Sequence, residues 1–208
     1  MPKRLLVAFD FDNTIIDGNS DTIVRDLLLT KPPKIPAVPG MTDLLRFLNQ
    51  SDVEVIIISD SNSFFINVWL EALFDQICTI AKVYTNQAFF DSSGLLNVSM
   101  YHDPPQDWCQ MCPKNLCKGF VLAKHLKEKL CEGIEFSHVA YIGDGRNDFC
   151  PCTKLMETDY IFPRQGYSLS KILEGSITKP NLTCEIKAIV NAWDNARNIQ
   201  HNLSQVLK

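Results

Sequence analysis

Two aspartates, Asp10 and Asp12, follow the first apolar segment of the chain with one residue between them. That segment, Leu5–Phe9, is bounded by polar residues, a pattern typical of a strand buried on both faces. In extended chain, side chains at i and i+2 point the same way, about 6–7 Å apart, so both carboxylates would face one small space. Such a pair favours metal binding or acid–base chemistry. The alternative is an acidic turn in which Asn13 and Thr14 cap the next element.

Two later segments repeat this construction. Val55–Ile58 is followed by Ser59-Asp60-Ser61-Asn62, and Val139–Ile142 by Gly143-Asp144-Gly145-Arg146-Asn147-Asp148. In an open parallel sheet, ligands bind beyond the carboxyl ends of the strands, so these ends should meet in one crevice. Carboxylates gathered there would need a cation, and oxygen ligands of this kind suit Mg²⁺. The side chains expected in the crevice are Asp10, Asp12, Ser59, Asp144 and Asp148.

The order of these motifs resembles that of the haloacid dehalogenase (HAD) superfamily of phosphohydrolases: D-x-D-x-T, apolar-S-D-x-N, a lysine, then G-D-G-x-N-D. Within this superfamily, four stretches of the chain resemble one family, the phosphoethanolamine/phosphocholine phosphatases. The pyridoxal phosphate phosphatases are a sister branch with nearly the same motifs. The resemblance runs from Lys3 to about Tyr167. The four stretches are Asp10–Asp21, Ile58–Asn62, Cys112–Lys118 and Tyr141–Pro151.

The resemblance implies a fold and a reaction. The expected fold is α/β, a single HAD-like domain over residues 1–208 with a Rossmannoid three-layer α/β/α arrangement and a central parallel sheet. The implied reaction is hydrolysis of a phosphate monoester, with Asp10 as the nucleophile that becomes phosphorylated and Asp12 as general acid and base. Mg²⁺ would be held by Asp10, Asp144 and the main-chain carbonyl of Asp12, with Asp148 acting through water or by orienting the other ligands.

Ser59 and Lys118 are the residues expected to hold phosphoryl oxygens. Lys118 falls in the first turn of an expected helix, Leu116–Leu130, where a cation is unfavourable to the helix dipole, so an anion nearby would explain it. Lys114 is the second candidate for this role, and a solvated surface lysine is the alternative interpretation.

Substrate recognition is assigned to Asp21 and Asp60, which match acidic residues linked in the resembling family to an ammonium headgroup. Both positions are acidic in the two branches, so they do not discriminate between them. Asn147–Pro151 and Gln205–Lys208 resemble the phosphoethanolamine/phosphocholine branch more than the pyridoxal phosphate branch, so the resemblance implies phosphoethanolamine or phosphocholine as substrate. A phosphotransferase would share the Asp10 chemistry but would need an acceptor other than water.

The segment 21–40 departs from the resembling family, which carries a helical cap domain at this point. Here it offers a short expected helix, Thr22 to about Leu29, and a proline-rich extended linker from Lys31 to Gly40. The cap is therefore expected to be largely missing. A catalytically weak binding or regulatory protein is the rival hypothesis, because a lost cap would leave substrate unheld.

Eight cysteines are present, and the tightest cluster is Cys109, Cys112 and Cys117. These could be three ligands of a zinc site with His102 as a fourth, but the irregular spacing and the lack of a second C-x-x-C favour a cysteine-rich loop without metal. Cys150 and Cys152 are expected to pack as small apolar residues.

Composition limits the other function classes. Of 208 residues, 46% are hydrophobic, enough for one α/β domain, and the net charge of −4 argues against a nucleic-acid groove. The first apolar run is too short for a signal peptide and ends in Asp10, so a cytoplasmic protein acting on a small phosphate ester, away from membranes, is expected. The oligomeric state is not indicated.

The remaining elements are expected from periodicity and turn residues. Residues 86–102 have the turn chemistry of a β-hairpin that could lean over the site as a flap or be a plain surface hairpin. Helices are expected at Met41–Gln50, Phe64–Phe74 and Ser168–Glu174. Two C-terminal helices are expected over 184–207, at about Cys184–Asp194 and at Ala196–Leu207. Strands are expected at Val53–Ile58, Val83–Tyr84 and Tyr160–Phe162.

Overall fold

The computed structural model describes residues 5–23, 35–50, 52–74, 77–179 and 183–207. Seven strands form one sheet in the order β4-β3-β2-β1-β5-β6-β7. Every neighbouring pair is parallel except β3 and β4, which are antiparallel. The strands are β1 Leu5–Phe9, β2 Val53–Asn62, β3 Ile80–Phe90, β4 Leu96–Ser99, β5 His138–Gly143, β6 Tyr160–Pro163 and β7 Ile189–Val190.

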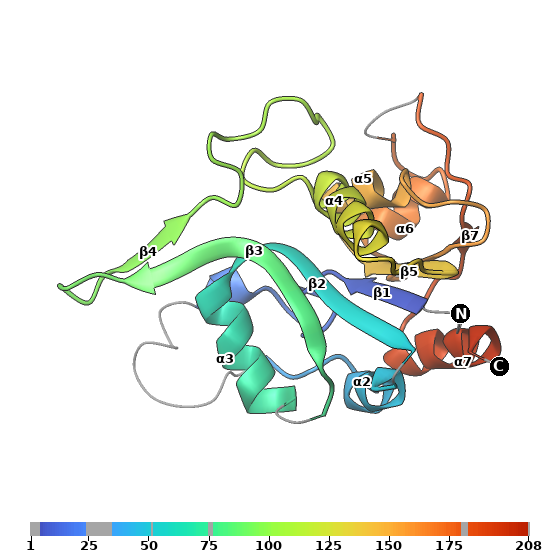
Figure 1. Ribbon diagram of the computed structural model, residues 1–208, viewed down its shortest axis with the longest axis horizontal. Helices are drawn as coiled ribbons and strands as arrows, with labels where there is room; N and C mark the ends of the chain where they lie inside the picture. The colour runs from blue at the N-terminus through green and yellow to red at the C-terminus, as the bar shows by residue number, and fades with distance from the viewer. Residues whose placement is uncertain (1–4, 24–34, 51, 75–76, 180–182, 208) are drawn as a thin grey trace.

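Helices cover both faces of this sheet (Figure 1). On one face lie α2 Met41–Leu48, α3 Ser63–Phe74 and α7 Ala196–Val206. On the other lie α4 Lys118–Cys131, α5 Phe149–Cys152 and α6 Ser168–Leu173. Two short 3-10 helices, η1 Ser20–Ile23 and η2 Arg146–Asp148, follow β1 and β5.

The central strand β1 shows why the sheet needs two helical layers. Its side chains alternate between the faces: Leu5, Val7 and Phe9 join one hydrophobic core, whereas Leu6 and Ala8 join the other. All five residues are buried, as expected for a parallel strand covered on both sides. The predicted α/β/α domain with a central parallel sheet is confirmed.

The expected elements are mostly present, and three differ. β2 continues to Asn62, whereas the prediction ended it at Ile58. β3 spans eleven residues rather than the two of Val83–Tyr84, because Thr85 and Asn86 continue the strand and donate side-chain hydrogen bonds to backbone carbonyls of β2. The prediction of a helix over Cys184–Asp194 was wrong, because this segment contains β7, which pairs with β6. The helix expected over Ala196–Leu207 is confirmed as α7.

The predicted hairpin is confirmed, with Gln87 opposite Ser99 and Phe90 opposite Leu96. It projects from the body of the domain at the edge of the sheet (Figure 1). Whether it closes over a substrate stays a prediction. Among the described residues no helix is both long and apolar enough to cross a membrane.

The segment 21–40, expected to be a residual cap and linker, is only partly described. Residues 24–34, which include most of the expected helix Thr22–Leu29, lie outside the described residues. The end of the proline-rich linker is extended, as predicted, and pairs with the chain after Asp12: Val38 N–H donates to Ile15 O at 3.0 Å, and Asp17 N–H to Pro36 O at 2.8 Å. The linker thus packs directly against the loop that follows β1.

Candidate active site

Three buried carboxylates meet beyond the carboxyl ends of β1 and β5. Asp10 directly follows β1, and its N–H donates to Ile142 O of β5 at 2.9 Å, which ties the two strand ends together. Asp144 directly follows β5, and Asp148 ends η2. One oxygen from each of Asp10, Asp144 and Asp148 lies within 4.8 Å of the others. The parallel register therefore converts two sequence motifs into one acidic cluster.

Lys118 lies between two of these acids. Its Nζ is 2.7 Å from Asp10 Oδ1 and 2.7 Å from Asp148 Oδ1, and its side chain is completely buried. The interpretation of Lys118 as a solvated surface residue was therefore wrong, and Lys114 is exposed. A cation at the start of α4 is stabilised here by two carboxylates, which offset its unfavourable position in the helix dipole.

Asp148 is held by a set of donors. Its Oδ1 accepts hydrogen bonds from Lys118 Nζ and from the Tyr141 hydroxyl, both at 2.7 Å. Its Oδ2 accepts from the N–H groups of Asp144, at 3.1 Å, and Gly145, at 2.8 Å. Gly143 permits this approach, because a Cβ at that position would be only 2.6 Å from Asp148 Cγ. Asp148 is thus fixed by its neighbours and can orient both Lys118 and Asp144.

Burial and like charge act together on this cluster. Burial, and then the charge of Asp148, raise the pKa of Asp10 well above its usual value, while Lys118 opposes the shift. The same two causes raise the pKa of Asp144 to about 7. Lys118, whose charge lowers the pKa of Asp10, therefore favours the ionised form of this carboxyl.

The donor set fits a hard divalent cation. Three carboxylates and one ammonium leave the cluster with excess negative charge, and closely spaced carboxylate oxygens are the ligands that Mg²⁺ prefers. The side chain of Asp12 is not a member of this cluster.

Asp12 turns instead toward the loop that follows β1. Its Oδ1 accepts a hydrogen bond from Ser20 N–H at 2.7 Å, and its Oδ2 accepts from the Ser20 hydroxyl at 3.1 Å. Burial raises the pKa of Asp12 to about 6, against the lowering effect of the Ser20 hydrogen bonds. The charges of Asp21 and Asp60 also raise this pKa, but burial is the larger cause.

The other expected site residues lie at the end of β2 and in η1. Ser59 is buried, and its hydroxyl oxygen accepts a hydrogen bond from Ser61 N–H at 3.2 Å. Asp60 is partly exposed, and its charge raises the pKa values of Asp10, Asp12 and Asp21. Asp21 is exposed at the surface, but neighbouring atoms partly desolvate its carboxyl. This desolvation raises its pKa more than the charge of Asp60 does. These two acids therefore share an electrostatic environment with the nucleophile candidate.

Sequence reasoning missed two supporting residues. Ser20, described above, falls inside a recognised motif, but its contact with Asp12 depends on the turn between them. Arg164 follows β6, and its guanidinium donates to Asn13 O at 2.7 Å and to Asp17 Oδ1 at 2.6 Å. Arg164 also stacks on Tyr167. The rule that polar residues after parallel strands reach one crevice would have found Arg164.

The fold of this chain is similar to that of solved phosphatase structures. The chain is similar to an apo phosphoserine phosphatase, with a TM-score of 0.52 and 16% identity over 83% of this chain and 98% of that one. It is also similar to D,D-heptose 1.7-bisphosphate phosphatase from B. bronchiseptica complexed with magnesium and phosphate, with a TM-score of 0.57 and 13% identity over 97% and 98% of the two chains. The fold is that of these HAD-type phosphatases.

Comparison with sequence relatives identifies the family to which the chain belongs. Residues 30–207 match the family described as Putative Phosphatase. The chain is 37% identical to human pyridoxal phosphate phosphatase PHOSPHO2, over 99% of both sequences, and 39% identical to its Bos taurus counterpart, over 82% of this chain and 86% of the relative. It is 32% identical to human phosphoethanolamine/phosphocholine phosphatase, over 99% of this chain and 90% of the relative. The chain therefore belongs to this family of HAD phosphatases.

Proposed function

We propose that the protein is a Mg²⁺-dependent phosphate monoester hydrolase that acts through a phosphoaspartyl intermediate on Asp10. The observation that carries this is the arrangement of Asp10 against Lys118, at 2.7 Å, beside Asp144 and Asp148. A nucleophilic carboxylate needs ionisation and the transferred phosphoryl group needs positive charge. Lys118 lies where it can supply both.

The residues take distinct roles in this proposal. Asp10 attacks phosphorus, and the bond from phosphorus to the leaving oxygen breaks. Asp12 gives its proton to that oxygen and then removes a proton from the water that hydrolyses the intermediate, a task suited to its pKa of about 6. Ser59 and Lys118 contact phosphoryl oxygens. Asp10, Asp144 and the Asp12 carbonyl would hold Mg²⁺, which supplies Lewis-acid stabilisation of phosphoryl charge, and Asp148 orients Asp144 and Lys118.

Substrate selection rests on the acids around the nucleophile. Asp21 and Asp60 add negative charge beside Asp12, which favours a phosphate ester with a cationic group close to the phosphate. Phosphoethanolamine and phosphocholine have this character. Pyridoxal 5′-phosphate is the second candidate, because relatives named for that activity share 37–39% identity with this chain, against 32% for the other branch.

The short cap segment bears on how tightly substrate is enclosed. The alignment with human PHOSPHO2 runs over 247 positions, more than the 208 residues of this chain, so part of that relative has no counterpart here. We infer a reduced cap over residues 21–40 and a more open site. An open site favours water as the phosphoryl acceptor, but it weakens the exclusion of solvent.

Phosphate release in the presence of Mg²⁺ tests the proposal. The substrates are phosphoethanolamine, phosphocholine, pyridoxal 5′-phosphate and a generic aryl phosphate, with Asp10→Asn as the control. Turnover that requires Mg²⁺ and is lost in Asp10→Asn supports the mechanism, and the ranking of kcat/KM selects the branch. A folded protein that binds Mg²⁺ but releases no phosphate would point to the binding or regulatory alternative.

A further inference from the structure

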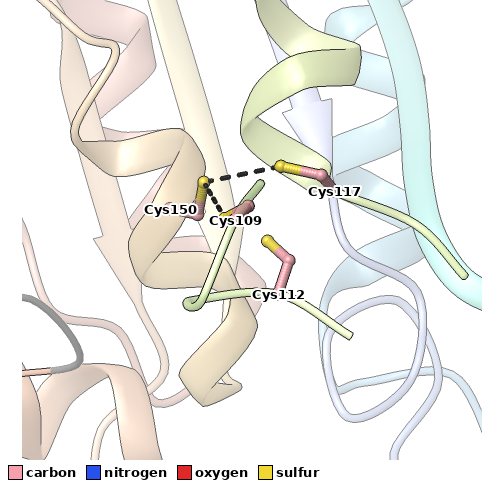
Figure 2. A group of neighbouring side chains, drawn as sticks. All are labelled: Cys109, Cys112, Cys117 and Cys150. Atoms are coloured by element: carbon pink, nitrogen blue, oxygen red, sulfur yellow. Dashed lines mark hydrogen bonds between the residues drawn. The ribbon is translucent and has the colours of Figure 1, made fainter. Parts of the chain in front are cut away.

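Four cysteines converge at a place outside the acidic cluster. Cys109 and Cys112 lie on the loop between β4 and α4, Cys117 directly precedes α4, and Cys150 lies in α5 (Figure 2). Their four sulfurs lie within 4.8 Å of one another. We propose that Cys109, Cys112, Cys117 and Cys150 form a structural zinc site.

The sulfur spacing fits one tetrahedral ion. A Zn–S bond of about 2.3 Å places the sulfurs of a tetrahedral site about 3.8 Å apart. The Cys150 sulfur is 3.6 Å from that of Cys109 and 3.8 Å from that of Cys117. Figure 2 shows the side chains of all four cysteines directed toward a common centre. A cluster with several irons would spread its ligands further, so a single ion suits this arrangement.

The fourth ligand differs from the one expected from sequence. His102 was the candidate, but its ring lies against Trp108 and Phe120 instead. Cys150 replaces it, because α5 brings this residue to the loop from far along the chain. The irregular spacing that argued against zinc is therefore a consequence of one ligand coming from a separate element.

The loop is organised around the sulfurs independently of any ion. The buried Gln106 side chain donates to the carbonyls of Cys109, Cys112 and Pro113 at 2.9–3.2 Å, and accepts from Cys109 N–H at 2.8 Å. Gly119 leaves room for Cys150, since a Cβ there would be 2.6 Å from its sulfur. Such a preformed arrangement is what a closed structural site requires.

The zinc site would join the two segments that carry Lys118 and Asp148. Cys117 is the residue before Lys118, and Cys150 is two residues after Asp148. A metal bond to each sulfur would fix α4 against α5 next to the ion pair of Lys118 and Asp148. The zinc is therefore structural, and its binding does not require the hydrolase activity proposed above.

Metal analysis of the intact, reduced protein tests this inference. Native mass spectrometry and elemental analysis after gel filtration should give one zinc per chain. Cys112→Ser should lower zinc retention at least tenfold, whereas Cys131→Ser should retain full zinc, because Cys131 is exposed at the end of α4, outside the cluster. Asp144→Asn and Asp10→Asn should also retain zinc, which separates this site from the carboxylate cluster.

A second measurement keeps the test valid if Cys112→Ser fails to fold. In the wild-type protein, alkylation followed by peptide mapping should label Cys131 and leave Cys109 and Cys112 protected until a strong zinc chelator is added. Cobalt substitution should give a sulfur-to-metal charge-transfer band. Four outcomes would overturn the proposal. The first two are zinc-free protein in which Cys109 and Cys112 are freely labelled, and iron in place of zinc. The other two are zinc that is lost in Asp144→Asn but kept in Cys112→Ser, and a disulfide within the cluster under reducing conditions.

Discussion

Ser20 holds the Asp12 carboxylate with two donors, its N–H at 2.7 Å and its hydroxyl at 3.1 Å. The same hydroxyl lies 2.8 Å from the Ser61 hydroxyl at the end of β2. Ser20 thus links η1, which follows β1, with the end of β2, and it sets the direction in which the candidate general acid points.

Ser20→Ala should lower kcat about 10–100-fold, the usual effect of removing a partner that orients a functional group. The hydrogen bond from the Ser20 hydroxyl lowers the pKa of Asp12, so its loss should raise that pKa above about 6, although the N–H of residue 20 still donates to Asp12. The limb of the pH–rate profile that belongs to Asp12 should therefore move to higher pH. Ser92→Ala, in the exposed hairpin turn, is the control. A lower kcat with an unchanged pH profile would show that Ser20 acts only on folding.

Lys118→Met should abolish turnover and destabilise the fold by about 3–5 kcal/mol, because it leaves Asp10 and Asp148 buried without their counter-charge. Lys124→Met is the matched control on the same helix; its pair with Glu128, at 3.9 Å, is exposed and should contribute at most about 1 kcal/mol. Urea unfolding of both variants measures the difference. Equal losses in the two would contradict the buried ion-pair assignment.

Stability in Mg²⁺-free buffer should fall as the pH rises. The pKa of Asp144 is raised from 3.8 to about 7 in the folded protein, and that of Asp10 is also raised, so the folded state binds more protons than the unfolded chain between these values. The stabilising contribution is complete below pH 3.8 and is lost as the pH passes about 7. Mg²⁺ should thus raise Tm more at high pH than at low pH. Asp144→Asn should flatten the Mg²⁺-free curve, and a wild-type curve that rises over this range would refute the prediction.

Arg164→Lys should reduce kcat with little change in KM, because a single ammonium cannot reproduce the planar fork that reaches both Asn13 O and Asp17 Oδ1. The lost contact to Asp17 should also destabilise the protein by about 1.5–3 kcal/mol. Arg46→Lys is the control, since Arg46 forms an exposed pair with Asp43. Steady-state kinetics and thermal unfolding would report the two effects, and a change confined to KM would place Arg164 at the substrate instead.

Local patterns predicted the fold well wherever one element decides its own structure. The apolar run Leu5–Phe9 and the helix after Ser63 needed no long-range information. The extent of β3 could not be predicted, because Thr85 and Asn86 are polar and their side-chain donors are satisfied by carbonyls of β2. β7 was missed because two residues carry too little periodicity to signal a strand.

The candidate site divides in the same way. Asp10 and Asp144 follow apolar runs, so the parallel-sheet rule brings them together. Arg164 follows β6 and falls under the same rule. Cys150 carries no local sign of its partners, which lie 33 or more positions away in the sequence. Contacts of this kind depend on tertiary packing, and spacing within a motif does not encode them.

The central position of β1 in the sheet determines when the acidic cluster can form during synthesis. Strand β1 is made before the other strands of the sheet, yet it lies between β2 and β5, and β5 begins only at His138. All of the chain from β1 to Asp144 must therefore be made before Asp10 can meet Asp144, and one edge of β1 stays unpaired during that time. A nascent chain would carry Asp10, the proposed nucleophile, early but could not complete the acidic cluster until translation had passed Asp148.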